Sequence, residues 1–152
     1  MRIVALVAGV TLLGCADATA PVSKAVVDGV LTGTGAALGK RHVLGTLIAS
    51  AGYGPTVEAV VEGTKVTVHV TTYGNSCVTA AATEVEVTGM EATIVPWDHD
   101  PGCHDRLLKQ VSHTVAIDFG QSGTARILVR GIDQSPVAGP DTVTIERVVL
   151  VP

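Results

Sequence analysis

One stretch, KVTVHVTTY at residues 65–73, constrains the fold of this chain more than any other. Its valines at positions 66, 68 and 70 alternate with Thr67, His69 and Thr71. Successive side chains of a β-strand point to opposite faces, so this alternation places every valine on one face and every polar residue on the other. The stretch therefore predicts a half-buried strand whose valine face lies against a core.

Shorter segments of the same kind recur along the chain, separated by turn residues. The predicted strands are 43–49, 57–61, 65–73, 83–87, 91–97, 113–119, 125–130 and 142–150. Residues 102–110, GCHDRLLKQ, are predicted to form one or two helical turns. Abundant Val and Thr, 17 Gly and 7 Pro suit short strands joined by turns. About seven or eight strands without long helices between them predict an all-β fold, an antiparallel two-sheet β-sandwich.

The later strands carry a resemblance to a known architecture. The stretch FGQSGTARILVRG at 119–131, followed by a final strand, resembles the later strands of an immunoglobulin-like fold. This resemblance concerns architecture and implies an immunoglobulin-like β-sandwich with one short helical turn. We expect that domain to span residues 41–152.

The N-terminus reads MRIVALVAGVTLLGC, one cation at Arg2 followed by an apolar run from Ile3 to Leu13. The run is too short to cross the hydrocarbon core as a helix and is typical of a signal peptide. Its end, LLGC at 12–15, resembles the lipobox of bacterial lipoproteins. The resemblance implies that residues 1–14 are removed and that Cys15 carries a diacylglyceryl group, with palmitate-type acyl chains. The alternative is an ordinary signal peptide cut near residue 18 or 20.

Lipidation at Cys15 implies attachment to a bacterial cell envelope, since two or three acyl chains anchor firmly. In lipoproteins of enterobacterial type, an Asp after the Cys retains the protein in the inner membrane. Ala16 stands there in this chain, which implies the outer membrane. Residues 15–40 are rich in Ala, Gly, Ser and Thr and are predicted to be a flexible tether.

Two cysteines remain once Cys15 is assigned to lipid. Thiols in an exported chain most simply pair with each other, so Cys77 and Cys103 are predicted to form a disulfide. The enclosed loop is of a length for which a disulfide contributes about 3–4 kcal/mol. A metal thiolate pair and a redox couple are alternatives that lack the C-x-x-C spacing.

The stretch WDHDPGCHD at 97–105 is the most suggestive for chemistry. Asp98, His99, Asp100 and His104 could converge on one divalent metal ion, because carboxylates and imidazoles are common metal ligands. The alternative is an exposed turn in which Asp98 or Asp100 caps a short helix. Trp97 could stack on a ligand or pack beside the disulfide.

Other function classes find little support. His69 and His113 are predicted to point to opposite sides of the sheet, and GQSGT at 120–124 lacks the spacing of a nucleophile elbow, so we expect no enzyme and no cofactor. The net charge is −4 and Lys40–Arg41 is the one basic pair, which argues against nucleic acid as a partner. We therefore expect a non-catalytic binding or structural module that meets the membrane through its lipid and binds a protein or envelope ligand. The alternative is a periplasmic or surface metal-binding protein using residues 98–105.

Overall fold

The computed structural model describes residues 42–49, 53, 56–103, 107–135 and 140–152. The predicted signal peptide, Cys15 and the tether lie outside the described residues, and what was predicted for them stays a prediction. Within the described ranges, no helix has the length and apolar character needed to cross a membrane.

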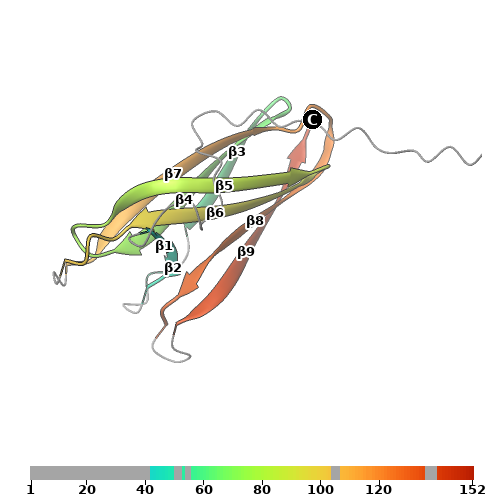
Figure 1. Ribbon diagram of the computed structural model, residues 1–152. Coiled ribbons are helices and arrows are strands. Elements are labelled where there is room, and N and C mark those ends of the chain that lie inside the picture. The colour runs from blue at the N-terminus through green and yellow to red at the C-terminus, as the bar shows by residue number, and fades with distance from the viewer. Residues whose placement is uncertain (1–41, 50–52, 54–55, 104–106, 136–139) are drawn as a thin grey trace, which may run out of the picture.

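The described part of the chain is all β-strand and turn, which confirms the predicted fold class (Figure 1). The strands are β1 (His42–Leu44), β2 (Thr46–Ile48), β3 (Thr56–Glu62), β4 (Lys65–Gly74), β5 (Thr79–Thr88), β6 (Glu91–His99), β7 (Lys109–Asp118), β8 (Gly123–Asp133) and β9 (Asp141–Val151). Each predicted strand coincides with one or two of these elements. Most observed strands extend one to four residues beyond the predicted bounds.

The strands form two layers that face each other across one core. One layer has the order β3–β4–β7 and the other has the order β5–β6–β8–β9. The short strand β2 pairs with β4 of the first layer and β8 of the second, so hydrogen bonds join the two layers. The edges also approach each other, β3 beside β9 and β5 beside β7. The arrangement is sandwich-like, as predicted.

The direction of two pairings differs from the predicted antiparallel sandwich. Strand β8 runs parallel to β6, from Glu91 beside Arg126 to Ile94 beside Val129, and parallel to β2. The chain leaves β6, forms β7 in the opposite layer and then returns to β8. Because β7 crosses over between them, β6 and β8 run in the same direction. The remaining pairings among the described residues are antiparallel.

The first predicted strand, 43–49, is divided in two at Gly45. The Gly45 N–H donates to the Pro96 carbonyl of β6 at 2.9 Å, and its carbonyl accepts from the Ile132 N–H of β8 at 2.9 Å. A Cβ at this position would lie 2.5 Å from Cγ2 of Thr72. A residue without a side chain therefore lets the chain cross from β6 to β8 inside the sandwich.

The core follows the alternation seen in the sequence. The valines of β4 are at most 1 % exposed and share one core cluster with inward residues of β2, β3, β6, β7, β8 and β9. The main buried apolar residues are Val66, Val68, Val70, Ala92, Ile94, Val115, Ile117, Phe119, Ala125, Ile127 and Val129. Aliphatic side chains thus fill nearly the whole of this cluster, with Phe119 as its aromatic member among the described residues.

The predicted helical turn at 102–110 is wrong at its C-terminal end. Lys109 and Gln110 belong to β7 and pair with Gly74 and Tyr73 of β4. Residues 104–106 lie outside the described residues. The long register between β4 and β7 extends the ladder to Lys109, and these backbone hydrogen bonds outweigh the local helical pattern.

Candidate functional site

A pocket of about 660 Å³ lies where β4, β6 and β8 end, beside β1. Its described lining is mostly apolar and includes Tyr73, Trp97, Leu108 and Ile132. Small-molecule sites are typically concave and apolar with a few placed polar groups, and this pocket falls in their size range. It is therefore the candidate functional site of the described chain.

The polar side chain set deepest in the pocket wall is Asp98. It is only 2 % exposed, although it lines the pocket. The predicted strand ended at Trp97, and the alternative that places Asp98 in an exposed turn is wrong. Strand β6 continues to His99, so its inward alternation runs through Ile94 and Pro96 to Asp98. That alternation was the signal that could have identified Asp98 as buried.

The partner of Asp98 is His113 on β7, which is 4 % exposed. The Asp98 Oδ1 atom lies 3.0 Å from His113 Nε2, and His113 Nδ1 lies 3.1 Å from the Thr83 hydroxyl. The Thr72 hydroxyl lies 3.4 Å from Nε2 and donates to the Val111 carbonyl. One imidazole therefore connects β4, β5, β6 and β7 across both layers. The prediction that His113 points inward and His69 outward is confirmed.

The neutral form of His113 fits this network. In the tautomer that carries the proton on Nε2, the ring donates to Asp98 while Nδ1 accepts from the Thr83 hydroxyl. Each ring nitrogen then has a partner of the right kind. In this arrangement the imidazole fixes the orientation of the Asp98 carboxyl group.

Hydroxyl, imidazole and carboxylate also occur together in hydrolases that use a serine or threonine nucleophile. In this chain the carboxylate end lines the pocket, whereas neither Thr83 nor His113 does. A ligand in the pocket would meet Asp98 rather than the Thr83 hydroxyl. The geometry thus suits a carboxylate held for binding.

The two oxygens of Asp98 have different surroundings. Oδ1 is bonded to His113, whereas no hydrogen bond from the described residues reaches Oδ2. Oδ2 lies beside the backbone of Gly45, where a Cβ would stand 3.3 Å from it. Asp98 thus has one oxygen held by His113 and a second without a hydrogen bond from the described residues, in a residue that lines the pocket.

Two ring nitrogens at the pocket wall also lack partners among the described residues. They are Nδ1 of His42 and Nε1 of Trp97, both buried. Buried polar atoms are nearly always paired in folded proteins, so unpaired ones draw attention to their surroundings. Both residues line the pocket. Two of the three buried polar atoms without a partner among the described residues therefore belong to residues that line the same cavity as Asp98, whereas the third, Oε1 of Glu84, does not.

The residues predicted to bind metal are brought together only in part. Asp98 and Asp100 both line the pocket, whereas His99 lies against the ring of His42 with 5.3 Å between centroids. Neighbouring residues of a strand point to opposite faces, so Asp98 and His99 diverge. No group of three or more His, Cys, Asp or Glu side chains within the described ranges could hold a metal ion. His104 lies outside those ranges, so its part in the metal hypothesis stays a prediction.

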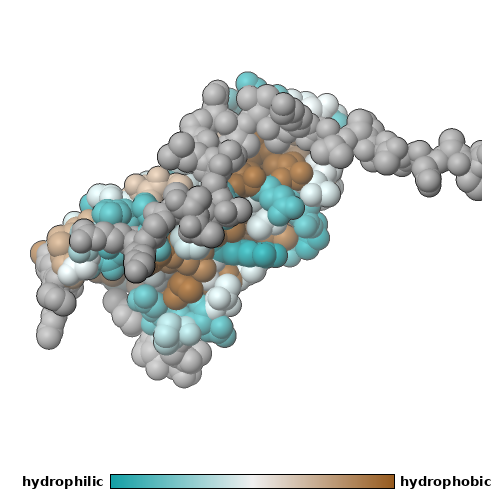
Figure 2. All heavy atoms as spheres, in the orientation of Figure 1, coloured by the Kyte–Doolittle hydropathy of each residue, from teal (hydrophilic) through white to brown (hydrophobic). Residues whose placement is uncertain are grey.

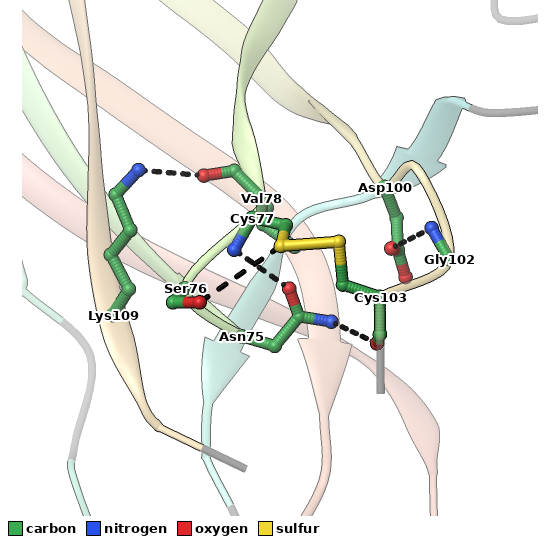
Figure 3. The surroundings of a disulfide bond; sticks show 8 residues. All are labelled: Asn75, Ser76, Cys77, Val78, Asp100, Gly102, Cys103 and Lys109. Carbon is green, nitrogen blue, oxygen red and sulfur yellow. Dashed lines mark hydrogen bonds between the residues drawn. A yellow bond between two sulfur atoms is a disulfide. The ribbon is translucent and has the colours of Figure 1, made fainter. Parts of the chain in front are cut away.

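The disulfide between Cys77 and Cys103 is confirmed, with 6.2 Å between the Cα atoms (Figure 3). Asn75 reinforces it, because its side chain donates to the Cys103 carbonyl at 3.1 Å and accepts from the Cys77 N–H at 3.0 Å. Asn75, Val78 and Asp100 all line the pocket. The disulfide therefore holds together two segments that form one wall of the cavity.

Two further hydrogen bonds, made by Asp100 and Lys109, hold this wall of the pocket. Asp100 Oδ1 accepts from the Gly102 N–H at 2.8 Å, the kind of turn in which Asp commonly occurs. Lys109, which is not itself a lining residue, donates from Nζ to the carbonyl of the lining residue Val78 at 3.0 Å (Figure 3). Of the predicted site residues, Asp98 and Asp100 belong to the pocket together with Trp97.

A comparison of the chain with protein families, curated proteins and solved structures found no match in any of the three.

Proposed function

We propose that this chain is a non-catalytic binding module, held at a bacterial cell envelope by lipid on Cys15, and that its ligand occupies the pocket at the end of the sandwich. The pocket carries the proposal. It has the volume of a small-molecule site, a mostly apolar lining and a few convergent polar groups. The LLGC sequence at 12–15 and the disulfide support an exported location, where disulfides persist.

The lining favours binding over catalysis. The pocket presents a carboxylate and aromatic rings, whereas the two hydroxyls within hydrogen-bond distance of the buried imidazole of His113, those of Thr72 and Thr83, lie outside the lining. A nucleophile must reach its substrate, so this placement leaves the pocket suited to holding a ligand. The core behind it is closely filled by aliphatic side chains, which gives the wall a rigid support.

Binding can be followed at Trp97, because it is the one tryptophan of the chain and lines the pocket. The indole N–H gives a single NMR signal in the full-length chain with its disulfide formed. We expect benzyl alcohol, a small neutral aromatic probe, to shift this signal in a saturable way. Absence of any shift with aromatic probes of every charge would contradict the pocket's role.

Two matched substitutions locate the binding site. Gln134→Phe places a ring at an exposed position of the pocket lining, and we expect it to weaken binding at least fivefold. Gln121→Phe makes the same change at an exposed position beyond the opposite end of β8, and we expect it to leave binding unchanged. Equal changes of probe affinity in the two variants would show that the probe binds outside the pocket.

Lipid attachment is tested independently of the pocket. The mature protein from bacterial membranes should begin at Cys15 and carry acyl mass in a mass spectrum, and it should partition into detergent. Cys15→Ala should lack the acyl mass and leave the detergent phase. A wild-type mature chain that begins beyond residue 15 without acyl mass would contradict the anchor.

A further inference from the structure

The charge of the pocket lining is one-sided. Asp98 and Asp100 are its carboxylates, and none of the described lining residues is Lys or Arg. The other ionisable side chains of the described lining are those of His42 and Tyr73. A cleft lined by charges of one sign attracts ligands of the opposite sign, and its apolar walls strengthen the attraction.

Asp98 offers a cationic ligand a specific contact within this negatively charged lining. Its side chain is 2 % exposed, and its Oδ1 atom is fixed by His113 at 3.0 Å. Oδ2 has no hydrogen bond from the described residues. A nearly buried carboxylate with one unpaired oxygen gains most from a donor that carries positive charge, because charge-assisted hydrogen bonds are the stronger ones.

The rings of the lining suit the same ligand. Trp97 adjoins Asp98 on β6, and Tyr73 lies at the end of β4. Aromatic faces attract cations as well as apolar groups, and tryptophan does so most strongly. The aliphatic residues Leu108 and Ile132 complete a surface that fits an apolar body.

We propose that the pocket binds a small organic cation, an ammonium group on an apolar body, with its N–H donors directed to Asp98 Oδ2. This inference rests on the proposed function, because it names the chemical class of ligand for the same pocket. The apolar body lies against Trp97 and the aliphatic lining. Asp100, in the turn beside Gly102, adds long-range attraction (Figure 3).

The test compares three probes of one shape that differ in charge. Benzylammonium, benzyl alcohol and benzoate are each titrated at neutral pH into the full-length chain with its disulfide formed, with the Trp97 indole signal as readout. We expect benzylammonium to bind at least about tenfold more tightly than benzyl alcohol, and benzoate to bind most weakly. Equal binding of cation and alcohol, or tighter binding of benzoate, would overturn the inference.

Substitution separates the local contact from the overall charge. Asp98→Asn keeps the shape of the side chain, and we expect it to reduce the preference for the cation to less than about threefold while benzyl alcohol still binds. Asp118→Asn changes the net charge equally at the far end of β7, and the preference should stay. An equal loss of the preference for benzylammonium in both variants would contradict a direct contact between the ligand and Asp98.

A third variant covers the case in which Asp98→Asn does not fold. Asp100→Asn lies in a turn at the pocket lining, and we expect it to lower the cation preference about twofold to threefold. An unchanged preference in a folded Asp100→Asn would count against the inference. If none of the three probes binds the wild-type chain, the proposed function fails together with the inference, whereas binding without charge preference overturns the inference alone.

Discussion

His113 is the residue whose side chain connects the buried polar groups of this sandwich. A buried carboxylate such as Asp98 is costly unless it is paired, and His113 supplies the partner from another strand. The same ring contacts hydroxyls of β4 and β5. One side chain thus satisfies polar groups of both layers and fixes the orientation of the Asp98 carboxyl group, which lines the pocket.

Removing this ring should therefore be strongly destabilising. We expect His113→Ala to lower the free energy of unfolding by about 3–5 kcal/mol, since it leaves Asp98 buried without its partner. His69→Ala is the control, because His69 is an exposed histidine on the neighbouring strand and bonds only Thr114 among the described residues. The control should cost less than about 0.5 kcal/mol. Chemical denaturation measures both, and similar losses in the two variants would contradict the network.

The inward direction of His113 could be predicted from sequence, but its partner could not. Parity along 113–119 placed His113 on the core face with Val115, because alternation is a local property. The Asp98 contact joins two strands of opposite layers and depends on how those layers stack. The chemical type of the 98–105 residues instead suggested a turn, which concealed the last two residues of β6.

At the scale of elements, alternation determines which faces are buried and the crossovers determine which strands meet. The burial of the β4 valines was predicted from their period of two. The parallel pairing of β6 with β8 was missed, because strand neighbours depend on the path of the chain between layers. The break at Gly45 was missed for the same reason, as only the packed structure shows the lack of room for a side chain there.

Two valines test the assignment of faces. Val68 of β4 is fully buried, and we expect Val68→Ala to lower the free energy of unfolding by about 2 kcal/mol through lost burial and a cavity. Val148 of β9 is 60 % exposed. Figure 2 shows hydrophobic residues at the surface by the C-terminal end of β9. Val148→Ala should change stability by less than about 0.5 kcal/mol. Thermal and denaturant unfolding check the pair, and the reverse order would contradict the register.

Acid should weaken the contacts at strand ends and on the β8–β9 hairpin. Donation by the Thr64 hydroxyl and the Gly120 N–H lowers the pKa of Asp118, and the Arg126 guanidinium lowers the pKa of Glu146. A carboxyl whose pKa is lower in the folded state stabilises the fold above its unfolded pKa, and this contribution is lost as pH falls through the folded value.

We therefore expect the free energy of unfolding to decrease below about pH 4, where ordinary carboxyls titrate. The double variant Asp118→Asn with Glu146→Gln should show a flatter decrease than the wild-type chain, although it starts from lower stability at neutral pH. Denaturant unfolding at a series of pH values measures the slope. An unchanged slope in the double variant would contradict these two contributions.

At the scale of the whole molecule, the two layers are joined by hydrogen bonds at β2, by the His113 network and at one end by the disulfide. The disulfide was predictable from two cysteines in a chain that is predicted to be exported. The pocket was not, because its lining comes from the ends of several strands that only the folded chain brings together. The end of the sandwich that carries the pocket is therefore also the end that the disulfide cross-links.

Removing the disulfide tests this link between stability and binding. The Cys77→Ser, Cys103→Ser double variant opens a loop whose ends are 26 residues apart, and we expect it to lower the free energy of unfolding by about 3–4 kcal/mol. Because the wall formed by Asn75 and Asp100 would loosen, probe affinity should fall as well. Unfolding and titration of oxidised and variant chains measure both effects. Full probe affinity in the folded variant would show that the pocket does not need this wall.

The location of the binding site is tested most directly by an amide chemical-shift map of the full-length, disulfide-bonded chain titrated with benzylammonium. Saturable shifts should cluster at the 42–46 segment, at 97–100 and at 132–134, and should be small in the turn after β7 around Gly120. Shifts that centre on the β7–β8 turn, or no saturable shifts at all, would contradict a binding site at the end of the sandwich.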